Sequence, residues 1–107
     1  MSYDIDLRVD TGRDLVSIRD WNYTYNVSPM FREAFDCLDG IRMLDGMSAP
    51  VAAKWLQIAV SAMRADPEKY RAMNPPNGWG SYEGVLKLLE EMLAECEGRT
   101  RCVVQVS

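Results

Sequence analysis

The stretch YDIDLRVDTGRDLVSI, residues 3–18, decides the fold. In residues 3–9 apolar side chains alternate with charged ones, and this period of two predicts a strand with one buried face and one wet face. Residues 10–14, DTGRD, supply turn chemistry, with a glycine that can take a positive φ. Residues 15–20 resume the alternation through Val16 and Ile18. The stretch therefore predicts an N-terminal β-hairpin.

The last residues of the chain predict a third strand. Residues 102–106, CVVQV, are rich in β-branched side chains and follow Gly98. Because an isolated two-stranded hairpin is marginal in water, we expect this strand to pair with the hairpin.

The middle of the chain is predicted to be helical. Ser28-Pro29 starts a helix that ends at Gly40, Ser48 starts a second that runs to about residue 65, and Ser81 starts a third with Gly98 after its end. Residues 68–71 form a short helical turn and residues 74–80 a loop. The second helix has only a narrow polar stripe, so we expect it to be the most buried element. The fold class is α+β, with a small antiparallel three-stranded sheet packed against these helices.

Composition indicates one globular domain over residues 1–107. Hydrophobic residues make up 48% of the chain and charged residues 26%. The net charge of -4 disfavours direct nucleic-acid binding, because a phosphate backbone would be repelled. No apolar run approaches the roughly 18 residues of a membrane span, and the N-terminus is not basic and then apolar as a signal peptide is. We therefore expect a cytosolic protein that does not contact a membrane.

The residues that most enzymes use are scarce. The chain has no histidine and no glycine-rich nucleotide motif, so we expect no catalytic residue, no metal and no cofactor. Two pairs of carboxylates, Asp4 and Asp6 on one strand face and Glu90 and Glu91 on the third helix, are better explained as solvated faces. The three cysteines have no CxxC spacing and predict no disulfide framework, and Cys96 and Cys102 are expected to be buried thiols.

Aromatic residues gather in two segments predicted to be irregular. The connection at residues 21–26 holds Trp21, Tyr23 and Tyr25, and the segment at residues 74–82 holds Trp79. Aromatic side chains on loops are typical anchors of protein interfaces. The alternative is that these rings cover the open edge of a small core.

Acidic residues gather on two of the predicted elements. Asp4, Asp6 and Asp10 fall on the exposed face of the first strand, and Glu83, Glu90, Glu91, Glu95 and Glu97 surround the third helix. Together they would present a negative surface to a positively charged nucleic-acid channel of a partner. The alternative is that these charges only keep the protein in solution.

Two segments carry a resemblance. NYTYNVSPMFREA (residues 22–34) and PEKYRAMNPPNGWGSYEGVLKLLEEML (residues 67–93) resemble small uncharacterised proteins of bacteriophages and mobile elements. Small acidic phage proteins of this size include many anti-CRISPR proteins, which occupy a surface of a Cas effector and often act as DNA mimics. The resemblance implies a protein partner, such as a Cas effector subunit, and assigns no activity to particular residues.

Three functional hypotheses follow. The first is a phage-encoded inhibitor of a host defence complex, an anti-CRISPR protein that binds a Cas surveillance complex and blocks target DNA access. The second is a phage accessory or structural protein that self-associates or joins a virion or replication assembly. The third is a hydrolase that uses carboxylates, or a metal site built from oxygen ligands alone.

Overall fold

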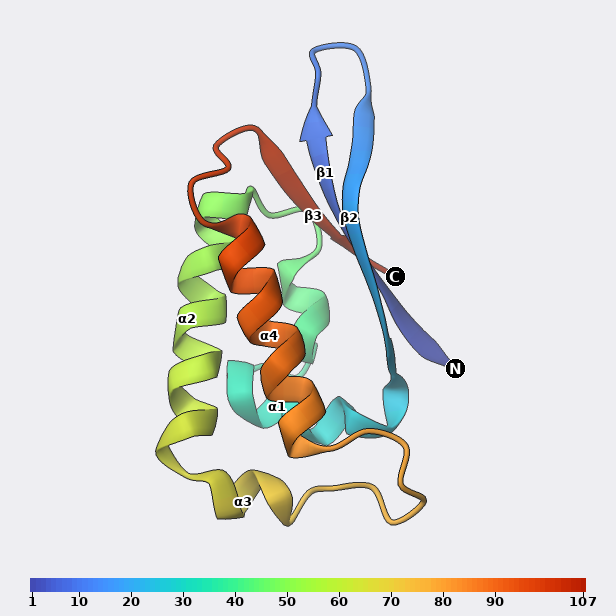
Figure 1. Ribbon diagram of the computed structural model, residues 1–107, viewed down its shortest axis with the longest axis vertical. Coiled ribbons are helices and arrows are strands. Elements are labelled where there is room, and N and C mark those ends of the chain that lie inside the picture. The colour runs from blue at the N-terminus through green and yellow to red at the C-terminus, as the bar shows by residue number, and fades with distance from the viewer.

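A three-stranded antiparallel sheet with the strand order β2-β1-β3 forms one side of the molecule, on the right in the computed structural model (Figure 1). The structure describes residues 1–107. β1 (Ser2–Asp10) lies between β2 (Leu15–Thr24) and β3 (Cys102–Val106), and both pairings are antiparallel. The predicted α+β class, the hairpin and the third strand are therefore confirmed.

Alternation along β1 places the core on one face of the sheet. Tyr3, Ile5 and Leu7 are buried, and Ile5 and Leu7 lie opposite Val106 and Val104 of β3. Directly opposite residues of an antiparallel pair point to the same face, so these side chains line one hydrophobic surface. The residues between them point to the other face, which no element buries.

β2 is longer than the sequence predicts. The strand begins at Leu15 as expected but continues to Thr24, so Trp21 and Tyr23 lie in the sheet and not in a connecting loop. The ladder carries an irregularity that leaves Ile18 without a partner, because Leu7 faces Arg19 while Arg8 faces Ser17.

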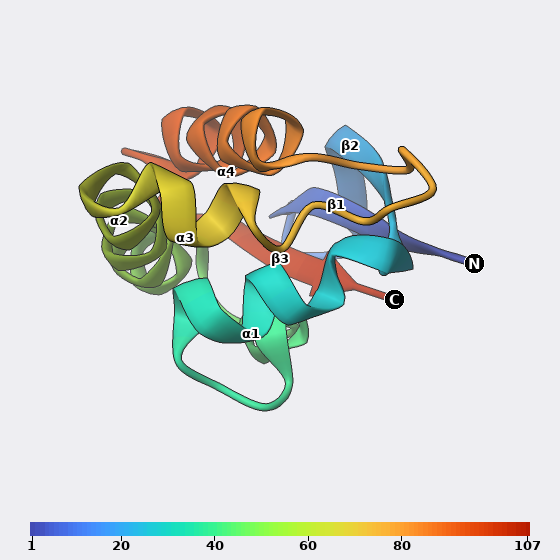
Figure 2. The ribbon, with the colours of Figure 1, turned by 90° about the horizontal axis from the view of Figure 1, so that it is seen from below.

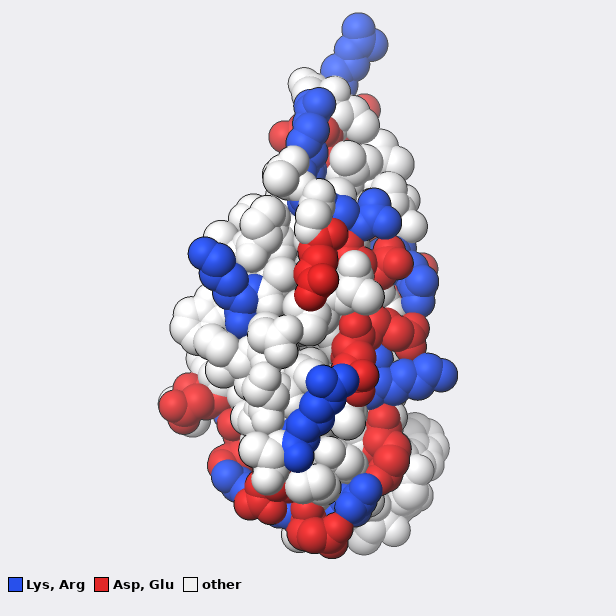
Figure 3. All heavy atoms as spheres, turned by 60° about the vertical axis from the view of Figure 1, so that its left-hand side comes forward, with Lys and Arg blue, Asp and Glu red and all other residues white.

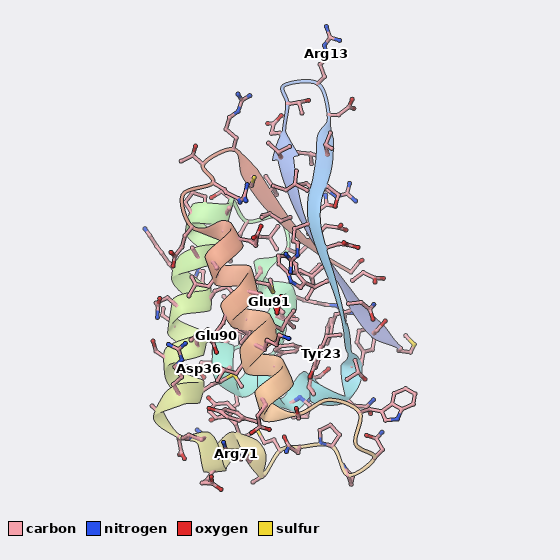
Figure 4. The ribbon with its side chains drawn as sticks, in the orientation of Figure 1. Arg13, Tyr23, Asp36, Arg71, Glu90 and Glu91 are labelled. Atoms are coloured by element: carbon pink, nitrogen blue, oxygen red, sulfur yellow. The ribbon has the colours of Figure 1, made fainter.

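The distal end of the hairpin is exposed on both faces. The expected half-buried pattern through Val16 and Ile18 is not found, because these side chains are 47% and 43% exposed. The cause is the overall arrangement: the hairpin rises beyond the helices, where no element covers it (Figure 1). Arg13 lies at its tip (Figure 4).

The first helix is shorter than predicted. A 3-10 turn, η1 (Tyr25–Val27), leads into α1 (Ser28–Phe35), which stops before Gly40. Asp36 takes the left-handed conformation, with φ of 50°, and closes the helix, since aspartate tolerates this region better than most residues. Leu38 consequently lies outside the helix and is 91% exposed. A second 3-10 helix, η2 (Gly40–Leu44), follows.

The remaining helices keep their predicted boundaries closely. They are α2 (Ala49–Ala65), α3 (Pro67–Arg71) and α4 (Tyr82–Cys96). Ser81 caps α4 by accepting a hydrogen bond from the Gly84 N–H at 3.0 Å, as its position predicts. Ser48 precedes α2 but makes no such bond.

α2 is not the most buried element, which corrects the sequence prediction. Val51, Trp55 and Ile58 are 43%, 38% and 55% exposed and form a stripe at helical spacing. The sequence shows that nearly all of this helix is apolar, but α2 packs at the side of the molecule and buries only one face (Figure 2).

One hydrophobic cluster fills the space between the sheet and the helices. It contains 26 buried residues, contributed by β1, β3, the two 3-10 helices and all four α-helices, and no polar or charged residue is buried with them. None of the helices is both long enough and apolar enough to cross a membrane. The core thus fixes the inner face of the sheet and leaves its outer face and one edge available.

Candidate functional site

The outer face of the sheet carries a row of carboxylates. Asp4, Asp6 and Asp10 alternate with the buried residues of β1 and therefore point away from the core, as predicted. Asp20 of β2 lies directly opposite Asp6 and adds a further carboxylate to this face. Asp20 is the last residue of the strand predicted from the sequence. Its position opposite Asp6 depends on the bulge at Ile18, which the sequence does not reveal.

These carboxylates differ in how far they are neutralised. Asp4 accepts a hydrogen bond from the Asn22 amide at 2.8 Å, and Asp6 accepts one from the Ser17 hydroxyl at 3.0 Å. The Arg8 guanidinium lies 3.6 Å from Asp6.

Asp10 has a local role, because its carboxylate accepts the Gly12 N–H at 2.8 Å and so stabilises the hairpin turn. Asp20 makes no polar contact with another side chain. The outer face therefore keeps a net negative charge that is centred on Asp4, Asp6 and Asp20.

The carboxylates of α4 are mostly paired with arginines. Glu90 reaches Arg64 of α2 at 2.7 Å and Glu91 reaches Arg19 of β2 at 2.9 Å, on opposite sides of the helix (Figure 4). Two further pairs are Glu83 with Arg71 at 2.9 Å and Glu95 with Arg99 at 3.4 Å. Figure 3 accordingly shows red and blue side chains interspersed over α4 and its neighbours. Of the acids at α4 named from the sequence, only Glu97 forms no ion pair with an arginine.

The pair at the start of α4 also shifts the acidity of its members. The hydrogen bond from Arg71 lowers the pKa of Glu83, and the bond to Glu83 raises the pKa of Arg71. Arg71 additionally bonds Glu68 of α3. This exposed network ties α3 to α4, which is a structural function and leaves little free charge for a partner.

Two of the predicted aromatic anchors hold the fold together. The Tyr23 hydroxyl accepts the Ser81 N–H at 3.4 Å and lies so close to Gly84 that a Cβ there would overlap it. Tyr25 packs edge-on against Tyr3 with ring centroids 4.4 Å apart, and its hydroxyl accepts a hydrogen bond from Arg42. Both rings therefore close the lower end of the core, which agrees with the alternative that they act as lids.

Trp21 and Trp79 occupy different surroundings. Trp79 is 65% exposed in the loop before α4. Trp21 is half-buried beside α4, with the Arg19 guanidinium 5.0 Å from its ring centroid. Its Nε1 is buried without a hydrogen-bond acceptor. An unsatisfied buried donor has a cost, so a ligand or partner that supplied an acceptor there would gain affinity.

A groove runs between β2 and α4. It has a volume of about 240 Å³ and is lined by Trp21 and Tyr23 from the strand and by Gly84, Lys87 and Leu88 from the helix. The Tyr23–Gly84 contact closes one end and the Arg19–Glu91 pair lies at the other. In this groove the structure brings the predicted aromatic residues Trp21 and Tyr23 together with the predicted acid Glu91. Lys87 was not predicted as part of it, because nothing in the sequence links β2 to α4.

A second hollow, of about 470 Å³, lies at the end of α1, between residues such as Arg32, Asp36 and Met73. None of the residues predicted as a site lines it. The buried thiols lie elsewhere: Cys96 and Cys102 are both buried, as predicted, and burial raises the pKa of Cys96 to about 11. Cys96 is therefore a protonated, unreactive thiol at neutral pH.

No group of three His, Cys, Asp or Glu side chains is arranged to hold a metal ion. Comparisons with protein-family models, with curated proteins and with solved structures find no match to this chain.

Proposed function

We propose that this protein is a phage-encoded inhibitor of a host defence complex: an anti-CRISPR protein that binds a Cas surveillance complex and blocks its access to target DNA. The observation that supports the proposal is the open outer face of the sheet, where Asp6 and Asp20 lie directly opposite each other beside Asp4. Like charges directly across two strands destabilise a sheet, so their presence favours a role in binding.

The chemistry of this face matches the proposed target. Successive outward residues of a strand are about 7 Å apart, and neighbouring strands are about 5 Å apart, so the carboxylates form a closely spaced array of negative charge. RNA-guided effectors hold nucleic acid in a positively charged channel. A protein of net charge -4 would be steered toward such a channel and would occupy it in place of DNA.

The test is DNA binding by type I and type II effectors in the presence of about a tenfold molar excess of the protein. The proposal predicts loss of DNA binding by at least one effector. Unchanged DNA binding by every effector tested would rule it out.

A matched pair of variants assigns the inhibition to the outer face. Asp20→Lys replaces the repulsive pair with Asp6 by an attractive one, so the variant should fold while losing inhibition. Glu97→Lys makes the same change in net charge at the exposed end of α4 and should keep inhibition. Equal losses in both variants would indicate that only net charge matters.

A second candidate is a phage accessory protein that acts through self-association or in a virion or replication assembly. The observation that favours it is the exposed aliphatic side chains of the hairpin, Leu15, Val16 and Ile18. A strict monomer in sedimentation, together with no recovery of phage proteins by the tagged chain, would count against it.

A further inference from the structure

The two edges of the sheet differ in whether another segment covers them. The outer edge of β3 is covered by residues 45–48: the Gly46 N–H donates to the Val104 carbonyl at 2.8 Å, and the Val104 N–H donates to the Met47 carbonyl at 2.9 Å. The Val106 N–H donates to the Asp45 carboxylate at 2.9 Å. This segment satisfies the backbone groups that β3 does not use for pairing with β1.

The outer edge of β2 has no such cover. The strand pairs only with β1, and none of the backbone hydrogen bonds outside the helices and strands involves residues 15–24. A strand of 10 residues therefore presents a row of unused N–H and C=O groups to solvent. Such a row is a template for pairing with another strand.

β2 has some of the features that protect free edges, namely the charged Arg19 and Asp20 and the bulge at Ile18, but it lacks others. Its sequence, LVSIRDWNYT, contains neither proline nor lysine. Leu15, Val16 and Ile18 add aliphatic surface that is 39%, 47% and 43% exposed. The only irregularity is the bulge at Ile18, which leaves the segment from Arg19 to Thr24 regularly paired with β1 and free along its outer side.

The charges along β2 exclude two partner registers and are compatible with one centred on Trp21. In an antiparallel pair related by a two-fold axis, a register centred on Arg19 or Asp20 would set like charges against each other, which is unfavourable. A register centred on Trp21 sets Arg19 against Tyr23 of the second copy and Asp20 against Asn22. These contacts are a cation over an aromatic ring and a carboxylate beside an amide. The groove beside Trp21 gives room for the second tryptophan.

We propose that two copies of this chain pair through β2, edge to edge and antiparallel around Trp21, to form a continuous six-stranded sheet. The contact is isologous, so it closes as a dimer and leaves the capped β3 edges at its two ends. It buries the free backbone groups between Ile18 and Thr24 of both copies, together with part of the exposed Ile18 side chain. The inference concerns the oligomeric state and does not rest on the proposed function.

Sedimentation over about 1 to 100 μM protein tests the pairing, because a dimer of moderate affinity populates both species in this range. The wild-type protein is expected to shift from monomer to dimer mass. Since each copy carries a net charge of -4, added salt should strengthen the dimer. A monomer at every concentration would overturn the inference, while the proposal on Cas binding would stand.

Two isoleucines provide a matched pair of variants. Ile18→Lys places a charge at the β2 edge and should weaken dimerisation by about tenfold or more. Ile58→Lys makes the same substitution on α2, where the side chain is 55% exposed, and should leave dimerisation unchanged. Both sites are exposed, so both variants should fold. A dimer that Ile58→Lys disrupts and Ile18→Lys does not would place the interface on α2 and overturn the inference.

Discussion

The two edge strands of the sheet pair with the same central strand and end up in opposite states. β3 is a short strand whose outer edge bonds to residues 45–48, and alternate residues of it are buried. β2 is twice as long, has an uncovered outer edge, and buries none of its residues fully. The core holds β3 in place, whereas β2 is held mainly by β1 and by contacts of Tyr23 and Arg19 with α4. The outer edge of β2 is therefore available to pair with another strand.

The largest effect is expected where β2 is attached to the helices. Gly84→Ala would force a Cβ onto the Tyr23 hydroxyl, and overpacking of this kind costs up to about 3 kcal/mol. Chemical denaturation measures the loss. Adding Tyr23→Phe removes the overlapping oxygen and should restore part of the stability. If the single variant is as stable as the wild type, the contact does not anchor β2.

A matched pair of valines compares the two edges directly. Val104→Ala on β3 removes a side chain that is 1% exposed and should lower the free energy of unfolding by about 2 kcal/mol. Val16→Ala on β2 removes one that is 47% exposed and should change it by less than about 0.5 kcal/mol. The measurement is made in dilute protein, so that dimerisation does not contribute. Equal losses would contradict the difference between the edges.

The cap on β3 is expected to contribute less than the core beneath it. Asp45→Ala removes the acceptor of the Val106 N–H and should cost about 1 kcal/mol. Asp39→Ala, a nearby exposed carboxylate without a side-chain capping bond, is the control and should be near neutral. A neutral Asp45→Ala would mean that water replaces this part of the cap.

The smallest effect at neutral pH concerns the thiol at the end of α4. Because burial raises the pKa of Cys96 to about 11, thiol reagents near pH 8 should modify Cys37 first and Cys96 only after unfolding. The unfolded chain loses this proton near pH 9, so stability should fall as the pH rises from there toward 11. Rapid labelling of Cys96 in the folded protein would contradict its burial.

The sequence is sufficient for the elements that have a regular period and clear caps. Alternation gives β1, and the capping Ser81 gives the start of α4. β2 is predicted too short because Asn22 and Asn26 are typical turn formers, while the pairing with β1 that extends the strand is a tertiary interaction. The left-handed Asp36 that ends α1 also has no signal in the helical periodicity.

The surface charges were less predictable than the fold. The α4 acids were recognised, but their partners Arg19, Arg64 and Arg71 come from three other elements, and no spacing rule relates them to α4. The exposure of Val51, Trp55 and Ile58 was also not predictable, because an apolar sequence does not show how many faces of the helix pack against other elements. Both features depend on how the elements dock.

Hydrogen exchange of the two edge strands tests most directly the claim that one edge is closed and the other is free to bind. In dilute protein, the Val104 and Val106 amides should be protected, whereas the outward amides of β2 should exchange rapidly. In concentrated protein, the β2 amides around Trp21 should become protected as well. Equal protection of both edges in the dilute protein, or no change in β2 on concentration, would contradict the account.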